Sequence, residues 1–207
     1  MTTLSSPRMA MQAVYAGGRS SRAGIRHPFD NYATPKCATE ALLAAIDFRR
    51  DRPVLEPACG DGYIVRVLRA HGFHVEASDI RTGPEVLGRK GVDFLRRQKP
   101  CDQLITNPPF GLVNEFIRHG AALCRGQMAL MLRLTFLEGA GRYHLLRKFR
   151  PCTYLVLSQR LPYQTPDGRW APTAGNFSHA WVVWNFAKRC RRTELRFTLL
   201  PHKEIEP

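Results

Sequence analysis

A strand, a turn of small residues and a helix follow one another within residues 54–70, and this order constrains the fold more than any other part of the chain. The apolar start of the segment indicates a strand, the turn contains Ala58, Gly60 and Gly62, and apolar residues then recur at helical spacing. A second strand is expected at 73–80. Strands and helices that alternate in this way predict an α/β fold with a mostly parallel sheet and helices on both faces.

The turn around Gly60 is suited to a ligand. Small residues let a ligand approach the backbone, and the turn leads into the positive end of a helix. Asp79 lies about 20 residues past the turn, the spacing at which a carboxylate in a Rossmann-like unit reaches ribose hydroxyls. The turn lacks the Gly-x-Gly-x-x-Gly pattern, which disfavours a nicotinamide dehydrogenase. Cys59 lies in the turn and is the cysteine that we expect to face a ligand.

Asn107-Pro108-Pro109-Phe110 follows a short apolar strand at 103–106. Two consecutive prolines have fixed φ and no N–H, so the chain cannot continue there as a helix or a central strand. The backbone carbonyls, the Asn107 amide oxygen and the flat ring of Phe110 then suit a planar group that carries an NH2. The alternative is an ordinary proline-rich turn between a strand and a helix.

Taken together, these motifs resemble those of S-adenosylmethionine-dependent amino-methyltransferases, especially small phage- or prophage-type enzymes that methylate adenine N6 in DNA. The resemblance extends from about Tyr32 to Trp184. It implies S-adenosyl-L-methionine as the cofactor and a Rossmann-like methyltransferase fold of seven strands with an antiparallel last strand. Ala58 stands where many relatives have Gly, and it is small enough for cofactor binding. We expect no separate target-reading domain, so the target sequence stays open.

The resemblance also assigns roles to single residues. The catalytic tetrapeptide is Asn107, Pro108, Pro109 and Phe110. The cofactor residues are Tyr32, Thr34 and Pro35 over the methionine part, Glu56, Ala58, Cys59, Gly60 and Gly62 in the glycine loop, Asp79 at the ribose, and Asp93 and Phe94 at the adenine. The segments 132–139 and 179–184 resemble late strands of such enzymes.

These roles predict a mechanism. An exocyclic NH2 donates hydrogen bonds to the Asn107 side-chain oxygen and the Pro108 carbonyl, while Phe110 stacks on the base. The bonds favour a more tetrahedral nitrogen and stabilise the positive charge that develops on it. In duplex DNA the base must first leave the helix.

The composition favours a nucleic-acid partner. The 31 Lys and Arg residues against 17 Asp and Glu give a net charge of +14, which attracts a phosphate backbone. Basic residues cluster at 142–150 and 188–192, although a basic, solvated face is the alternative. The clusters do not separate DNA from RNA, and the resemblance favours DNA. No run of 18 apolar residues exists, so we expect no membrane contact.

We expect three parts: a basic, flexible arm at 1–28, a methyltransferase domain at 29–190 and a tail at 191–207. The arm is rich in Arg and poor in acids, so a targeting presequence is its alternative interpretation. The six cysteines are widely spaced, which disfavours a metal site and predicts a reduced, intracellular protein. The resemblance to phage- and prophage-type enzymes implies the cytoplasm of a bacterial or phage-infected cell.

The remaining pattern predicts helices and strands around these motifs. Helices are expected at 38–48, 112–124 and 142–149, and strands at 127–136, 153–158 and 180–186. The connection 160–178 is long and contains Tyr163 and Trp170, which could stack on a base or pack on the sheet edge.

Alternative functions stay open at this stage. A turn of this kind also resembles methyltransferases that act on adenine N6 or guanine N2 in RNA, or on a glutamine side chain of a protein. The basic charge disfavours the protein substrate. A non-catalytic nucleic-acid-binding module with the same fold is a further alternative.

Overall fold

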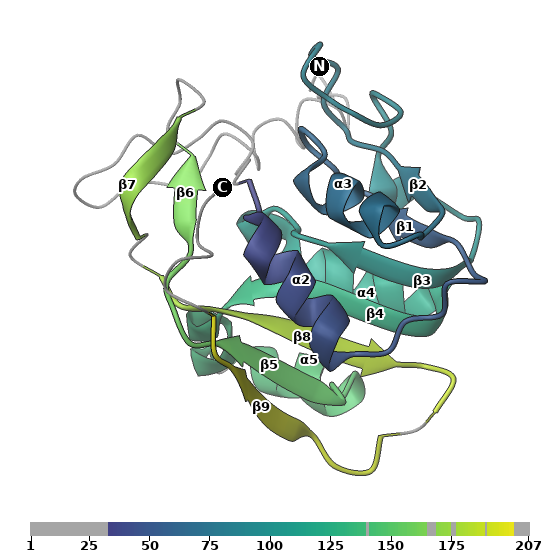
Figure 1. The fold of residues 1–207 in the computed structure, drawn as a ribbon. Coiled ribbons are helices and arrows are strands. Elements are labelled where there is room, and N and C mark those ends of the chain that lie inside the picture. Colours follow the sequence, from purple (N-terminus) through teal and green to yellow (C-terminus); the bar gives the residue numbers. More distant parts are fainter. Residues whose placement is uncertain (1–32, 140, 165–168, 175–176, 189, 201–207) are drawn as a thin grey trace, which may run out of the picture.

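A seven-stranded sheet forms the centre of the molecule (Figure 1). The computed structural model describes residues 33–139, 141–164, 169–174, 177–188 and 190–200. In spatial order the strands are β2 (Val75–Ala77), β1 (Val54–Glu56), β3 (Cys101–Thr106), β4 (Cys124–Arg133), β8 (His179–Asn185), β5 (Thr153–Leu157) and β9 (Glu194–Thr198). β8 is antiparallel to both of its neighbours, and the other neighbouring pairs are parallel.

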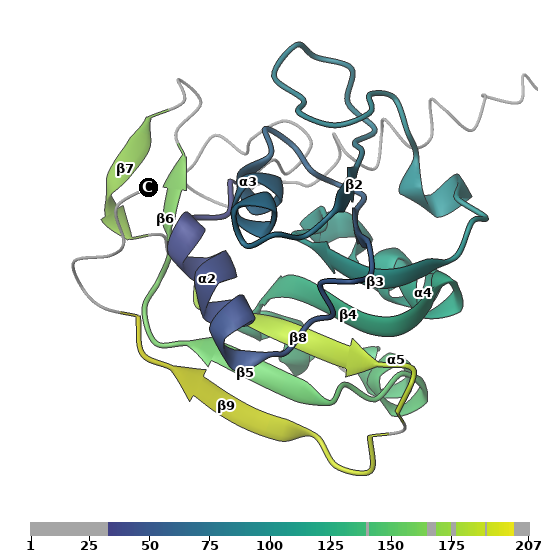
Figure 2. The same cartoon turned by 45° about the vertical axis from the view of Figure 1, so that its right-hand side comes forward.

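Helices cover both faces of the sheet (Figures 1 and 2). The helices α2 (Lys36–Ala45) and α3 (Tyr63–Ala70) pack on one face, and α4 (Val113–Leu123) and α5 (Arg142–Lys148) pack on the other. Short 3-10 turns are η2 (Phe94–Arg96), η3 (Phe110–Leu112) and η4 (Leu134–Glu138). None of the helices in the described ranges is long and apolar enough to cross a membrane.

The side chains of the central strands alternate between two cores. On β4, Ala129 and Met131 join the core under α2 and α3, whereas Leu130 and Leu132 join the core under α4 and α5. This alternation follows from the two-residue period of a strand. Burial on both faces explains why the sequence of β4 is a nearly continuous apolar run.

Two tryptophans of β8 fix the layers on either side of the sheet. Trp181 and Trp184 are almost fully buried. The indole N–H of Trp181 donates to the carbonyl of Ala38 in α2 at 2.7 Å, and that of Trp184 donates to the carbonyl of Phe149 after α5 at 3.0 Å. Each large ring therefore buries its apolar surface and satisfies its polar group.

The predicted fold class is confirmed. The helices and strands predicted from the sequence pattern are present with shifted ends, and the last of these strands, 180–186, is the antiparallel strand β8. The late strand expected at 132–139 is wrong: β4 ends at Arg133, and Leu134–Glu138 is the 3-10 turn η4. The segment 191–207, expected to be a tail, contributes the edge strand β9 at 194–198, whose alternating apolar residues were a missed strand signal. The arm at 1–28 lies outside the described residues.

The long connection between β5 and β8 contains a hairpin of its own. β6 (Pro162–Gln164) and β7 (Trp170–Ala174) pair with each other in an antiparallel, two-stranded sheet (Figure 1). Trp170 meets the ring of Tyr63 edge-on at 5.6 Å between ring centres, and Gln164 donates to the Tyr63 hydroxyl at 2.8 Å. Trp170 therefore contacts the first residue of α3, and the side chain of Tyr163 lies outside the description.

The expectation that every cysteine is reduced is wrong for one pair. Cys152 and Cys190 form a disulfide, with their Cα atoms 5.4 Å apart. Cys152 lies just before β5, and Cys190 lies in the connection from β8 to β9. The pairing of β9 with β5 brings them together across 38 residues, so their spacing gave no sign of it. Cys37 and Cys124 are buried, as expected for small core residues.

The order of the strands creates a crevice at one end of the sheet. The chain passes from β1 to β2 on one side of β1 and returns to β3 on its other side. In open α/β sheets, ligands bind at such a switch point, outside the carboxyl ends of the strands. The loops after Glu56, Ala77 and Thr106 all start at this edge.

Gly62 and Gly72 provide a matched test of the packing beneath the glycine loop. Both have positive φ, 86° and 81°, so a Cβ at either position strains the backbone. A Cβ on Gly62 would lie 2.7 Å from the Leu87 Cβ, whereas nothing lies within 4 Å of one on Gly72. We expect Gly72→Ala to cost about 1 kcal/mol of unfolding free energy. Gly62→Ala should cost roughly 1–3 kcal/mol more, because Leu87 must move.

Urea denaturation of both variants measures this difference. Equal losses would show that Leu87 does not pack firmly against the loop.

Candidate functional site

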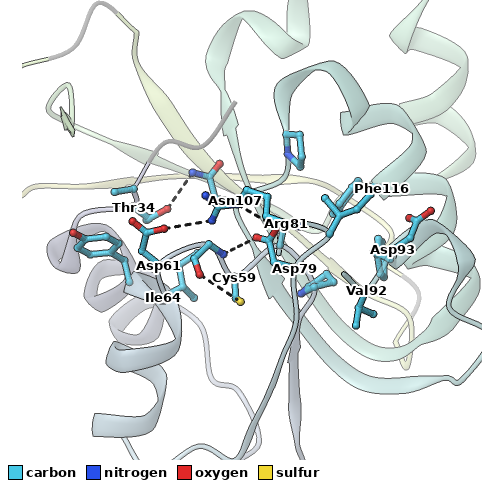
Figure 3. A pocket seen from close by; sticks show the side chains of 18 residues that line it. Thr34, Cys59, Asp61, Ile64, Asp79, Arg81, Val92, Asp93, Asn107 and Phe116 are labelled. Atoms are coloured by element: carbon cyan, nitrogen blue, oxygen red, sulfur yellow. Dashed lines mark hydrogen bonds and ion pairs between the residues drawn. The ribbon is translucent and has the colours of Figure 1, made fainter. Parts of the chain in front are cut away.

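A pocket lies at the carboxyl ends of β1, β2 and β3 (Figure 3). It is open to solvent, and the loops that follow all three strands contribute to its wall. The lining residues are Ala33, Thr34, Pro57, Ala58, Cys59, Gly60, Asp61, Tyr63, Ile64, Asp79, Ile80, Arg81, Val92, Asp93, Phe94, Asn107, Pro109 and Phe116.

Most residues predicted for the site lie in this one pocket. Those that line it are Thr34, Ala58, Cys59, Gly60, Asp79, Asp93, Phe94, Asn107 and Pro109. Those that do not line it are Pro35, Glu56, Gly62, Pro108 and Phe110. Tyr32 lies outside the described residues.

Asp79 shapes the glycine loop from below. One carboxylate oxygen accepts from the Gly60 N–H at 2.8 Å, and the other accepts from the backbone N–H of Arg81 at 2.8 Å. The Arg81 side chain also approaches Asp79 at 3.3 Å and Asp61 at 3.4 Å. Each carboxylate oxygen can accept more than one hydrogen bond, so Asp79 can hold the loop and still receive hydroxyl groups from the pocket.

Glu56 lies under the pocket and joins its two halves. One of its oxygens accepts from the Ala58 N–H at 3.1 Å and from the Thr106 hydroxyl at 2.5 Å. Ala58 belongs to the glycine loop, and Thr106 immediately precedes Asn107. Complete burial raises the pKa of Glu56 to about 8, although the two hydrogen bonds act in the opposite direction. Its role is therefore to position both loops from outside the pocket wall.

Asn107 faces the pocket in a fixed orientation. Its side-chain NH2 donates to the Thr34 hydroxyl at 3.1 Å, so the amide oxygen points to the other side of the group. Thr34 is buried and lies just before α2, 73 residues away in the sequence. Pro108 is buried behind Asn107, and Pro109 lines the pocket beside it.

The two ends of the pocket differ in chemistry, as Figure 3 shows. Val92, Asp93 and Phe116 lie together at one end, and Thr34 and Asn107 lie at the other. The rings of Phe116 and Phe94 pack 4.8 Å apart at the apolar end, and Asp93 adds a carboxylate there.

This arrangement fits S-adenosyl-L-methionine. The apolar end with its carboxylate suits an adenine, Asp79 suits the ribose, and the carboxylates suit a ligand with a sulfonium and an ammonium group. Burial raises the pKa of the Cys59 thiol to about 12, so this pocket residue is a neutral wall and not a nucleophile.

Several lining residues had not been predicted. Asp61, Tyr63 and Arg81 reach the pocket from the glycine loop, the start of α3 and the turn after β2. Asp61 follows Gly60 directly, and this position could have been found from the loop alone. Arg81 gave no signal, because its contacts with two acids depend on how the loops meet. No group of three or more His, Cys, Asp or Glu side chains suited to a metal occurs among the described residues.

The two basic clusters meet at the end of the sheet away from the pocket, although Arg142, at the start of the first cluster, contacts Thr135 and Phe136 just after the carboxyl end of β4. The Arg150 side chain donates to the carbonyl of Arg191 at 3.0 Å, so the clusters at 142–150 and 188–192 meet. They meet near Cys152, before the amino end of β5. Asn107 lies at the carboxyl ends of the parallel strands, which is the opposite end of the sheet from this meeting point.

A methyltransferase resembles part of this chain in sequence. No protein-family model matches the chain. The type II methyltransferase M.TthHB8I of Thermus thermophilus is 28% identical over 125 residues, which is 56% of this chain and 29% of that enzyme.

Solved structures show the same fold at low sequence identity. A modification subunit assigned to a type I restriction enzyme in Vibrio vulnificus has a TM-score of 0.60 at 13% identity, covering 94% of this chain and 51% of that one. The methyltransferase subunit of a type I restriction-modification system from Streptococcus thermophilus has a TM-score of 0.53 at 15% identity, covering 84% of this chain and 51% of that one. An O-methyltransferase predicted in Agrobacterium tumefaciens has a TM-score of 0.51 at 16% identity, covering 80% of this chain and 85% of that one.

These findings confirm the expected fold and the resemblance to class I methyltransferases. The chain spans 29% of the length of its curated relative and about half the length of the two restriction–modification subunits.

Glu56 gives the stability of the protein a specific pH dependence. Between its ordinary pKa of 4.5 and about 8, the folded state keeps a proton that the unfolded state releases. The unfolding free energy therefore falls as pH rises through this window, by at most about 1.4 kcal/mol per pH unit for one group. Glu56→Gln mimics the protonated acid and should be less sensitive to pH.

Urea denaturation of both proteins between about pH 5 and 8 measures the difference. The same slope in wild type and Glu56→Gln would mean that Glu56 does not retain its proton in the folded state.

Proposed function

We propose that this chain transfers the methyl group of S-adenosyl-L-methionine to an exocyclic amine of a nucleic-acid base, with adenine N6 in DNA as the preferred acceptor. One observation carries the proposal: Asn107 and Pro109 line the same pocket as Gly60, Asp79 and Asp93. Residues suited to an amine acceptor and residues suited to the methyl donor therefore share one cavity.

The donor supplies an activated methyl group when it is bound, so the protein mainly positions and polarises. Asp79 and the Gly60 loop hold the ribose side, and Asp93 with Phe94 holds the adenine side. Asn107 presents its amide oxygen to the acceptor NH2, and Thr34 keeps the amide from rotating. This hydrogen bond strengthens as positive charge develops on the nitrogen, which lowers the barrier.

The proposal needs no strong base, because the hydrogen bond from the acceptor NH2 to the Asn107 amide oxygen stabilises the charge that develops on the nitrogen. The acceptor nitrogen can lose its proton to water after the methyl group has been transferred. Cys59 is neutral because burial raises its pKa to about 12, and burial with the nearby Arg133 lowers the pKa of His179 to about 4.

Charge and relatives favour a nucleic-acid acceptor. The net charge of +14 supports binding to a phosphate backbone. The two type I restriction–modification subunits that share the fold favour DNA over RNA. The basic residues around Arg150 and Arg191, at the far end of the sheet, can hold a strand only where it extends past the pocket.

Methyl-labelled S-adenosyl-L-methionine tests the proposal directly. Purified protein is incubated with DNA, RNA and protein pools side by side, and the labelled product is digested and identified. We expect N6-methyladenine in DNA. Label in an RNA base amine would move the acceptor to RNA, and label in protein alone would overturn the nucleic-acid assignment.

Asn107→Ala should separate transfer from donor binding. We expect turnover to fall roughly 100- to 1,000-fold, the loss typical of removing one preorganised hydrogen-bonding group from a transition state. Affinity for S-adenosyl-L-methionine should change little, because the side chain serves the acceptor. Thr34→Val removes the hydroxyl that orients the Asn107 amide and should lower turnover less. Near-normal turnover of Asn107→Ala would remove Asn107 from the mechanism.

Asp79→Ala should weaken donor binding by about 1–3 kcal/mol, the range for losing a hydrogen bond to a charged group. Isothermal titration calorimetry with S-adenosyl-L-methionine measures the change. Glu85→Ala is the matched control, since Glu85 also contacts Arg81, at 3.6 Å, but does not line the pocket. Equal affinities of the two variants would place the ribose away from Asp79.

A further inference from the structure

Arg133 covers the ring of Phe110, the last residue of the catalytic tetrapeptide. Its guanidinium carbon lies 3.9 Å from the centre of the Phe110 ring and 3.9 Å from the centre of the Phe177 ring. Arg133 ends β4, and Phe177 lies two residues before β8. One planar cation therefore stacks against two aromatic rings from different parts of the chain.

His179 completes this cluster. It pairs with Arg133 across β4 and β8, and its ring centre lies 6.4 Å from that of Phe110, with the planes 30° apart. Burial and the nearby guanidinium lower the pKa of His179 to about 4, so the imidazole is neutral near pH 7. Arg133 is therefore the cationic member of the cluster formed by Phe110, Arg133, Phe177 and His179.

The mechanism expected from the sequence stacks the target base on Phe110, and the guanidinium already covers one face of that ring. A base that stacks on this face of Phe110 must displace it, since both are flat groups at stacking distance from the same ring. The exchange is feasible, because a cation over an aromatic ring and a base stacked on one have interaction energies of the same order.

Electrostatics require the same displacement. Methyl transfer creates positive charge on the acceptor nitrogen, and a guanidinium beside it would oppose that charge. A backbone phosphate is a strong alternative partner for arginine, because the two can form charge-assisted, bidentate hydrogen bonds. Phe177 is 42% exposed, so this cluster opens to solvent where a strand could approach.

We propose that Arg133 is a placeholder for the target base. It stacks on Phe110 and Phe177 until a nucleic-acid strand binds, and then moves to a backbone phosphate while the base takes its position. This inference rests on the proposed function. It adds a specificity device: a free nucleoside has no phosphate to draw Arg133 away, so the protein discriminates in favour of strands.

The test compares a nucleoside with a strand. Protein saturated with S-adenosylhomocysteine, which fills the donor pocket, is titrated with 2-aminopurine deoxyriboside and with short single-stranded DNA that contains one 2-aminopurine. Fluorescence reports stacking of this base. The proteins are wild type, Arg133→Ala, Arg133→Lys and the control Arg125→Ala. Arg125 is an exposed arginine on the same strand, β4, near its opposite end.

We expect opposite changes for the two ligands. Arg133→Ala should bind the nucleoside roughly tenfold more tightly, the factor expected from removing one competing cation–π contact. It should bind the strand more weakly, and the salt dependence of that binding should be shallower by about one phosphate contact. Arg125→Ala should leave nucleoside binding unchanged.

Arg133→Lys keeps the charge and loses the flat group. It should therefore bind the nucleoside more tightly than wild type and retain the salt dependence of strand binding. If Arg133→Ala proves unstable to urea, the Lys variant carries the test. Parallel loss of nucleoside and strand binding, or no change in either, overturns the placeholder.

The two proposals fail in different experiments. The fluorescence titrations require no methyl transfer, so opposite changes in binding would support the placeholder even if no labelled base were found. Conversely, methyl transfer to DNA with unaltered nucleoside binding by Arg133→Ala would support the proposed function and refute the placeholder.

Discussion

The carboxyl group of Glu56 holds together the two halves of the site. It accepts hydrogen bonds from the glycine loop at Ala58 and from Thr106, the residue before Asn107. The glycine loop, proposed to hold the donor, and the turn at Asn107, proposed to hold the acceptor, are thereby tied to one buried atom. Because the group is fully buried and its pKa is raised to about 8, a proton on it avoids the cost of a buried charge. A small shift of Glu56 would displace both loops.

Strand order explains why these loops can meet at all. β1 lies between β2 and β3, and the chain leaves and returns on opposite sides of it. The crevice at this switch point receives Asp79 from one neighbour of β1 and Asn107 from the other. α2 then brings Thr34 to Asn107, and the Trp181 hydrogen bond to Ala38 fixes α2 on the sheet. The orientation of the Asn107 amide thus depends on packing across three layers.

Charge is divided between the two edges of the sheet. The basic clusters around Arg150 and Arg191 lie at the edge opposite the pocket, whereas Arg133 lies beside Phe110 at the pocket edge. Net charge alone could not reveal this division. Under the proposed function, overall attraction to a strand and entry of a base into the site would involve different cations. The disulfide of Cys152 and Cys190 joins the start of β5 to the connection before β9, near the basic clusters and away from the site.

The sequence by itself determined the local features: the βαβ order, the turn with positive φ at Gly60 and Gly62, and the rigid corner at Pro108 and Pro109. These features follow from backbone constraints within a few residues, and most of the site residues predicted from them do line the pocket. Only the tertiary structure decided which distant side chains meet: Thr34 with Asn107, Arg133 with Phe110 and Phe177, and Cys152 with Cys190. The pairing of β8 with β4 sets the contact of Arg133 with Phe177, and the pairing of β9 with β5 brings Cys152 and Cys190 together. Such pairings depend on the burial of whole faces of the sheet, which local patterns do not encode.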